Sequence, residues 1–151
     1  MGKQVIVVNK ELNMSKGKMA AQVSHASMAF LTRQFLDKDC RNKHVVYDQD
    51  TNKKSGYVLT IPINEDVNEW MMNSFTKVIL EVKNENQLYK LIEKAKENGF
   101  IENEDFFCIR DNCRTELIPD ETGTRFTCIG FKPMEAEKID KVTKRLQLFK
   151  E

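Results

Sequence analysis

The sequence is poor in the residues that build metal sites. It holds only two histidines and four cysteines, and no two cysteines form a C-x-x-C pair. A structural zinc site needs four such ligands at close spacing, so we expect no metal, and nothing in the sequence requires a cofactor. Cys108 and Cys128 lie inside apolar runs, which is typical of small core residues.

Long apolar segments are also missing. No stretch approaches the ~20 residues of a membrane-spanning helix, and the first apolar run, at residues 5–8, is too short for a signal peptide. The net charge is only +1, so no global field attracts nucleic acid, although local lysine clusters can still do so. We therefore expect a reduced, cytoplasmic protein with no membrane partner.

What is present is typical of one globular domain spanning residues 1–151. Of these residues 40% are hydrophobic and 31% are charged. Apolar, β-rich runs alternate with helical patterns, which predicts a three-layer α/β sandwich with helices on both faces of a small, mixed, mostly parallel four-stranded sheet. The expected strands are 5–8, 77–82, 106–109 and 126–131, and the expected helices are 15–35, 84–99 and one beginning at Pro133. The strand at 126–131 is expected to be antiparallel, because a loop joins it to its predecessor.

An insertion interrupts this alternation at residues 40–74. After a polar stretch at 37–43, two short strands at 44–47 and 56–61 flank a polar turn, which predicts an inserted β-hairpin. Residues 62–74 are expected to form a loop or short helix. They contain Trp70, which we interpret as core filling or a dimer contact.

The most informative segment is residues 13–26, which follows the first strand and opens a helix. Ser15 is the expected N-cap of that helix. Lys18, Gln22 and His25 recur at i, i+4 and i+7 and form one polar stripe, with Lys16 beside it. Free amides at a helix start attract anions, so this segment predicts a site for a phosphate-bearing ligand.

A second polar segment follows the third strand. In α/β sheets, ligands bind beyond the carboxyl ends of the strands. The first strand ends shortly before Lys18 and the third ends before Asp111. We therefore expect these two side chains to share one mouth.

Four segments in this order, residues 5–26, 76–78, 109–116 and 139–143, resemble the type II peptidyl-tRNA hydrolases. The resemblance covers most of the chain outside the insertion. It implies a mixed four-stranded sheet between helices and a possible homodimer. It also implies hydrolysis of the ester that joins a peptide to the 3′ ribose of tRNA, with peptidyl-tRNA as the partner.

The resemblance also implies roles for individual residues. Lys18, Asp111, Thr115 and Thr127 match catalytic positions, while Gln22, Lys16, His25 and Arg114 match substrate-binding positions. One departure stands inside the second motif, where Cys113 replaces the glycine of the family. If this position needs a positive φ, a cysteine there is strained.

No Ser-His-Asp set is visible, so direct attack by water is favoured over a covalent intermediate. Lys18 is expected to stabilise the oxyanion or hold a phosphate, and Asp111 to orient the water. As a base, Asp111 would need a raised pKa. The plainer alternatives are an ordinary turn closed by Asp111, a salt bridge from Asp111 to Arg114, and a structural role for His25.

Two other function classes remain open from the sequence. The first is a non-catalytic relative that binds tRNA or another RNA, which the change at Cys113 suggests. It predicts salt-sensitive tRNA binding without ester cleavage. The second is a protein-interaction module that uses the inserted hairpin. It predicts that point changes at Lys18 are harmless and that deletion of the hairpin is not.

Overall fold

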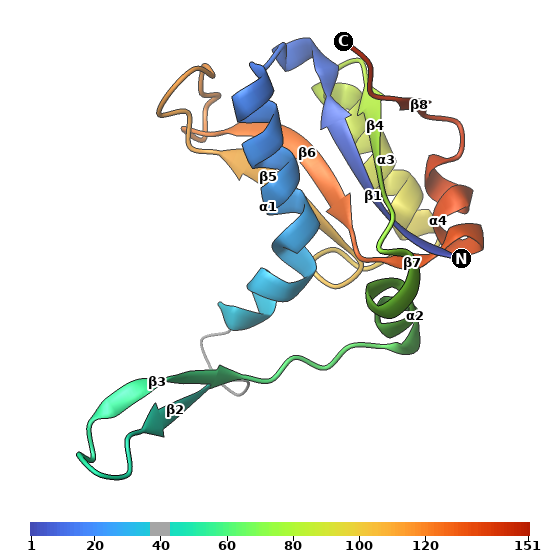
Figure 1. Cartoon of the computed structure of the whole chain (residues 1–151). Coiled ribbons are helices and arrows are strands. Elements are labelled where there is room, and N and C mark those ends of the chain that lie inside the picture. The colour runs from blue at the N-terminus through green and yellow to red at the C-terminus, as the bar shows by residue number, and fades with distance from the viewer. Residues whose placement is uncertain (37–42) are drawn as a thin grey trace.

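The computed structural model describes residues 1–36 and 43–151 (Figure 1). Its elements follow the chain as β1 (Gly2–Asn9), η1 (Lys10–Leu12), α1 (Lys16–Phe35), β2 (Lys43–Tyr47), β3 (Lys54–Leu59), α2 (Glu65–Glu69), η2 (Trp70–Ser74), β4 (Lys77–Val82), α3 (Glu85–Glu97), β5 (Phe106–Asp111), β6 (Arg125–Phe131), β7 (Met134–Glu135), α4 (Ala136–Thr143) and β8 (Gln147–Leu148). Cys40 and the polar stretch expected at 37–42 lie outside the described residues.

The main sheet has the strand order β5-β6-β1-β4-β8, and β7 pairs with the start of β1. β1 and β4 are parallel, whereas β6 is antiparallel to both of its neighbours. The mixed sheet and the antiparallel strand at 126–131 are therefore confirmed. Only one neighbouring pair is parallel, fewer than expected, because β6 lies between the like-directed strands β1 and β5. The short strands β7 and β8 also add to the four expected.

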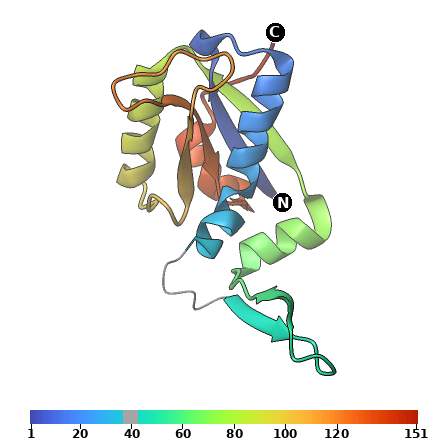
Figure 2. The ribbon, with the colours of Figure 1, turned by 90° about the vertical axis from the view of Figure 1, so that its left-hand side faces the viewer.

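Successive side chains of β1 point to opposite faces, and both faces are covered. Val5 and Val7 pack in a cluster with residues of α3 and α4. Ile6 and Val8 pack in a second cluster with residues of α1 and α2. Figures 1 and 2 show α1 on one side of the sheet and α3 on the other. The expected three layers are confirmed, and the continuous β-branched run of β1 follows from burial on both faces.

The predicted N-cap of α1 is present, and α3 is capped in the same way. Ser15 Oγ accepts a hydrogen bond from the backbone N–H of Lys18 at 3.2 Å and begins α1. Asn84 Oδ1 accepts from the N–H of Gln87 at 3.0 Å and begins α3, which Gly99 follows with a φ of +85°.

The last helix begins three residues later than the sequence suggests. Pro133 is followed by β7, whose Met134 and Glu135 pair with Lys3 and Gly2. The chain therefore stays extended until Ala136, where α4 begins. Ile139 and Val142 of α4 pack in the core.

The insertion forms its own two-stranded sheet, β2 and β3, which projects from the body beyond the end of α1 (Figure 1). None of its strand residues is buried. By contrast, Trp70 is only 2% exposed and lies edge-on to Phe30, so the core-filling interpretation of Trp70 is confirmed. In the part of the chain that the structure describes, no helix is long and apolar enough to cross a membrane.

Candidate active site

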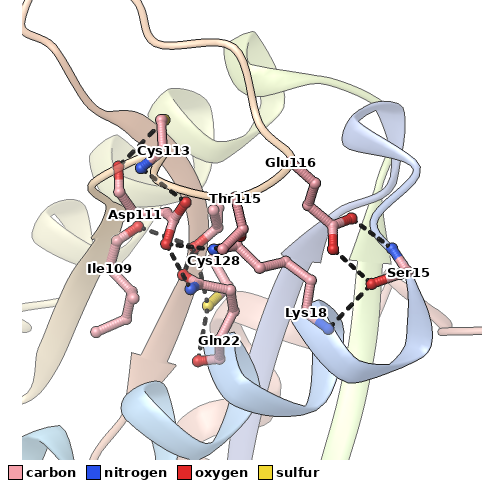
Figure 3. Close-up of polar contacts among 10 residues, drawn as sticks. Ser15, Lys18, Gln22, Ile109, Asp111, Cys113, Thr115, Glu116 and Cys128 are labelled. Atoms are coloured by element: carbon pink, nitrogen blue, oxygen red, sulfur yellow. Dashed lines mark hydrogen bonds and ion pairs between the residues drawn. The ribbon is translucent and has the colours of Figure 1, made fainter.

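The first turn of α1 and the last residue of β5 bring Lys18 and Asp111 together (Figure 3). Lys18 Nζ lies 2.8 Å from Asp111 Oδ1, and the two side chains are only 13% and 11% exposed. The expectation that Lys18 and Asp111 lie in one site beyond the carboxyl ends of the strands is confirmed. The alternative of an Asp111–Arg114 salt bridge is not what the structure shows, because the cation paired with Asp111 is Lys18.

Gln22 and Thr127 lie behind this pair. Gln22 Nε2 donates to Asp111 Oδ1 at 3.1 Å, while Gln22 Oε1 accepts from the Thr127 hydroxyl at 2.7 Å. Gln22 is 2% exposed and Thr127 is fully buried in β6. The two residues therefore form a buried chain of hydrogen bonds from β6 through α1 to the carboxylate. Neither side chain is open to solvent.

The turn after β5 fixes the second carboxylate oxygen. The backbone N–H of Cys113 donates to Asp111 Oδ2 at 2.9 Å, so the Asx-type turn considered from the sequence is also present. Cys113 has a φ of +58°, in the left-handed region that favours glycine. The strain expected for a cysteine at this position is confirmed.

The environment of Asp111 holds its pKa below the ordinary value. Burial raises the pKa, but the hydrogen bonds from Lys18 and the Cys113 N–H, the charge of Lys18 and the Gln22 amide together outweigh burial. The raised pKa that a general base needs is therefore not found. Asp111 is ionised at neutral pH and is suited to hold and orient its neighbours.

Lys18 retains a free donor. Its ammonium group has three N–H bonds, and the described residues use two of them, one to Asp111 and one to Thr115 Oγ1 at 3.2 Å. Thr115 itself is exposed on the loop after β5. The third N–H can therefore bind an oxyanion beside the Asp111 carboxylate.

Glu116 occupies the start of α1, a role that the sequence motif did not reveal. Its carboxylate accepts from the backbone N–H of Ser15 at 2.9 Å and from the Ser15 hydroxyl at 2.6 Å. These hydrogen bonds lower the pKa of Glu116. The phosphate site expected at this helix start thus holds a carboxylate of the same chain, which fastens the loop after β5 to α1. The only sequence signal was the position of Glu116 next to Thr115.

The other three predicted residues make no described contact with the Lys18–Asp111 pair. Lys16 points toward the C-terminal tail, where its Nζ lies 3.2 Å from Glu151. His25 and Arg114 are exposed, and no described residue forms a hydrogen bond or ion pair with the Arg114 side chain. His25 is exposed on α1, so the structural role considered for it from the sequence stays a prediction. In residues 1–36 and 43–151, no group of three or more His, Cys, Asp or Glu side chains is placed to hold a metal ion.

The known proteins to which this chain is similar belong to one family. The model of the family described as peptidyl-tRNA hydrolase PTH2 matches residues 2–149. A peptidyl-tRNA hydrolase of Methanopyrus kandleri is 37% identical over 150 residues, covering 99% of this chain and 100% of the relative. One of Methanococcus maripaludis is 33% identical over 98% of this chain and 99% of its own, and one of Thermoplasma acidophilum is 32% identical over 97% of each. The chain therefore belongs to the type II peptidyl-tRNA hydrolase family.

Proposed function

We propose that this protein is an esterase that binds peptidyl-tRNA and hydrolyses the bond between the peptide and the 3′ ribose, releasing free tRNA and peptide. The observation that carries this proposal is the largely buried Lys18–Asp111 pair at 2.8 Å, in a chain of this family. A protein that only binds RNA has no use for a carboxylate held beside its anion-binding lysine. The non-catalytic alternative is therefore the weaker one.

Lys18 acts on the ester carbonyl. Attack by water moves negative charge onto the carbonyl oxygen, and the free N–H of Lys18 can donate to that oxygen. An oriented ammonium in a partly water-excluded site stabilises this charge more in the transition state than in the ground state. Thr115 Oγ1, 3.2 Å from Lys18 Nζ, limits where the ammonium can point.

Asp111 orients the attacking water. Its Oδ1 is taken by Lys18 and Gln22, while Oδ2 has one described donor, the Cys113 N–H, and can accept a hydrogen bond from water. Water adds to the carbonyl carbon, and the oxyanion that forms then collapses and breaks the bond to the ribose oxygen. The proton lost by the water balances the one gained by the ribose 3′ oxygen. No covalent enzyme intermediate is required.

Gln22 and Thr127 are positioning residues in this proposal. Their hydrogen-bond chain holds the Asp111 carboxylate against Lys18 from the buried side. Arg114 and His25 are exposed, and Lys16 is exposed at the start of α1 beside Glu151, so all three are accessible and are assigned to contacts with the substrate. Substitution of Lys16, Arg114 or His25 is expected to change KM. Substitution of Gln22 or Thr127 is expected to lower kcat.

The test is release of tRNA from N-acetyl-aminoacyl-tRNA by the wild type, Lys18→Ala and Asp111→Asn. Loss of one oxyanion donor costs about 10²–10³ in kcat, and we expect falls of this order in both variants. Lys141→Ala is the matched control, since Lys141 is an exposed lysine on α4, across the sheet from α1. Circular dichroism checks the fold. Turnover retained within about threefold by folded Asp111→Asn would remove Asp111 from the mechanism.

We also propose that residues 1–151 form one catalytic domain carrying the 40–74 insertion, that it acts in the cytoplasm, and that it forms a homodimer.

The dimer is supported by apolar side chains exposed around η2, Met72 at 74% and Phe75 at 56%. Sedimentation of wild type and Met72→Glu tests it. A wild type that sediments as a monomer at micromolar concentration contradicts the dimer.

A further inference from the structure

The inserted hairpin has one face that combines lysines with aromatic rings. The register pairs Lys43 with Leu59, Val45 with Tyr57, and Tyr47 with Lys54. Lys43, Val45 and Tyr47 alternate with their neighbours along β2 and share one face with their partners. The register shifts between Val46 and Tyr47, and this bulge brings Lys54, three residues before Tyr57, onto the same face. Tyr47 is 58% exposed and Tyr57 is 48% exposed, although the body of the protein lies next to the base of the hairpin. We refer to these six residues as the arm face.

The two lysines of the arm face rest on an aromatic ring. Lys43 Nζ lies 4.2 Å and Lys54 Nζ 4.1 Å from the centre of the Tyr57 ring, and Lys54 also donates to the Tyr57 hydroxyl. No carboxylate of the described residues forms an ion pair with either lysine. Stacking surfaces flanked by cations are the usual means of holding RNA without reading its sequence.

The acidic side chains of the hairpin lie at its turn. Asp48 accepts hydrogen bonds from the N–H groups of Asp50 and Thr51, so its carboxylate closes the turn. These bonds lower the pKa of Asp48, which keeps it charged. The turn holds Asp48 and Asp50 together with Lys53, so a polyanion is attracted mainly to Lys43 and Lys54 on the stem of the hairpin.

The position of the hairpin relative to the active site fits a long substrate. Lys18 lies at the start of α1 and the hairpin follows its end, and 20 helical residues span about 30 Å. In Figures 1 and 2 the hairpin and the loop after β5 project to the same side of the sheet, with α1 between them.

Two grooves cover the surface between the active site and the hairpin. One, of about 540 Å³, is lined by His25, Met28 and Arg33, and the next, of about 790 Å³, is lined by Arg33, Ile63 and Lys132. Arg33 lines both, so they follow one another along α1. Glu104 also lines the second groove and Lys132 is paired there with Asp105 at 2.9 Å, so Arg33 is the cation that the two grooves share.

We propose that the hairpin is an arm that binds the body of the tRNA while the 3′ ester lies at Lys18. The proposal rests on the proposed function, because the ester fixes one end of the substrate and the remaining RNA must extend away from the site. The arm face supplies the cations and the ring surface for backbone and base contacts at the far end of α1.

The test compares two substrates and two variants. The substrates are N-acetyl-aminoacyl-tRNA and the same ester on a CCA trinucleotide, which is too short to reach the arm. The variant is Lys43→Gln/Lys54→Gln. Its matched control is Lys83→Gln/Lys90→Gln, which removes the same charge from exposed lysines before and within α3, on the other face of the sheet. Binding of uncharged tRNA is measured over a salt series.

We expect the arm variant to raise KM for the tRNA ester roughly tenfold and to leave the trinucleotide ester unchanged. Because two lysines no longer neutralise phosphates, the slope of log K against log salt should flatten by about 1.4–1.8. The control variant should match the wild type in every measurement. Thermal unfolding confirms that both variants are folded.

Other results separate the proposals. If the arm variant binds and cleaves tRNA like the wild type, the arm does not contact RNA, and its apolar side chains then indicate a protein interface. If the wild type cleaves neither ester, the proposed function fails. The arm is still tested in that case by the affinity and salt slope for uncharged tRNA, and unchanged values in the arm variant overturn it.

Discussion

Cys113 carries backbone strain at the centre of the site. Its φ of +58° is costly for a residue with a Cβ, by roughly 1–2 kcal/mol. The strain is maintained because this conformation turns the Cys113 N–H onto Asp111 Oδ2 at 2.9 Å. The motif therefore tolerates a side chain where glycine is the unstrained choice, and it keeps the geometry that Asp111 requires.

Replacing this residue by glycine should stabilise the protein. We expect Cys113→Gly to raise the free energy of unfolding by about 1 kcal/mol, since relief of the strain outweighs the freedom that glycine gains in the unfolded chain. Urea unfolding of both proteins at pH 7 measures the difference. Cleavage of N-acetyl-aminoacyl-tRNA should stay within about threefold. A less stable Cys113→Gly protein would mean that the Cys113 thiol makes a packing contribution larger than the strain.

The lowered pKa of Asp111 makes a prediction about pH. The folded protein holds the pKa of Asp111 below its ordinary value, so the unfolded chain binds this proton more readily. The contribution of Asp111 to the free energy of unfolding is therefore lost only as the pH falls below about 4. The acid limb of kcat/KM should therefore lie below about pH 4 and not near neutrality. Initial rates on folded enzyme, from neutral pH down to the acid limit of folding, measure it. An acid limb near neutral pH that Asp111→Asn removes would show instead that Asp111 acts as a base.

Sequence reasoning found the pair and named Gln22, Thr115 and Thr127 as site residues, but not how these residues connect to the pair. Lys18 and Asp111 could be placed together because each follows the carboxyl end of a strand and the motif spacing is distinctive. The burial of Thr127 behind Gln22 depends on β6 lying against α1, which no local pattern encodes. The Glu116–Ser15 contact joins residues that are 101 positions apart, so only the folded loop reveals it.

At the scale of elements, α1 lies against β6 at one glycine. A Cβ built on Gly130 would come within 2.2 Å of the carbonyl oxygen of Ala26, a backbone atom that cannot move alone. The close approach of the helix to the strand brings Gln22 onto Thr127. The active site therefore depends on the absence of a side chain at Gly130, which lies near the end of β6 and outside the motifs that identify the site.

Gly130→Ala should consequently weaken both stability and activity. Forcing α1 away from β6 costs about 1–3 kcal/mol, as in other overpacked cores, and we expect an additional fall in kcat as the hydrogen-bond chain to Asp111 is stretched. The matched control is Gly56→Ala in β3, where a Cβ would meet nothing within 4 Å. Thermal unfolding and turnover are measured for both variants. Equal behaviour of the two would show that the helix can shift without disturbing the site.

The order of elements was predictable because each has a strong local signal. The capped starts of α1 and α3 and the apolar runs of the strands survive in the fold with small boundary changes. The pairing of strands was less accessible. The position of β6 between β5 and β1, and the extension of the chain through β7 before α4, depend on contacts between distant residues.

At the scale of the whole molecule, the body and the hairpin are built differently. One hydrophobic cluster joins the sheet to α3 and α4 and the other joins it to α1 and α2, and neither includes a residue of β2 or β3. A two-stranded hairpin with no buried strand residue adds little stability of its own. The body should therefore fold and catalyse without the hairpin, and the hairpin should matter only for what it contacts.

Shortening the arm tests this separation. Because Lys43 and Leu59 pair directly, residues 44–58 can be replaced by an Asn-Gly turn without straining the base. We expect the shortened protein to unfold within a few degrees of the wild type and to cleave the trinucleotide ester at an unchanged rate, since the core stays intact. Thermal unfolding and initial rates on that ester measure the two quantities. A large fall in unfolding temperature would contradict the independence of the body, because it would mean that the hairpin packs on the body in solution. If the shortened protein keeps its stability and is slower only on the tRNA ester, the hairpin serves to bind the tRNA. The catalytic pair then works within the body.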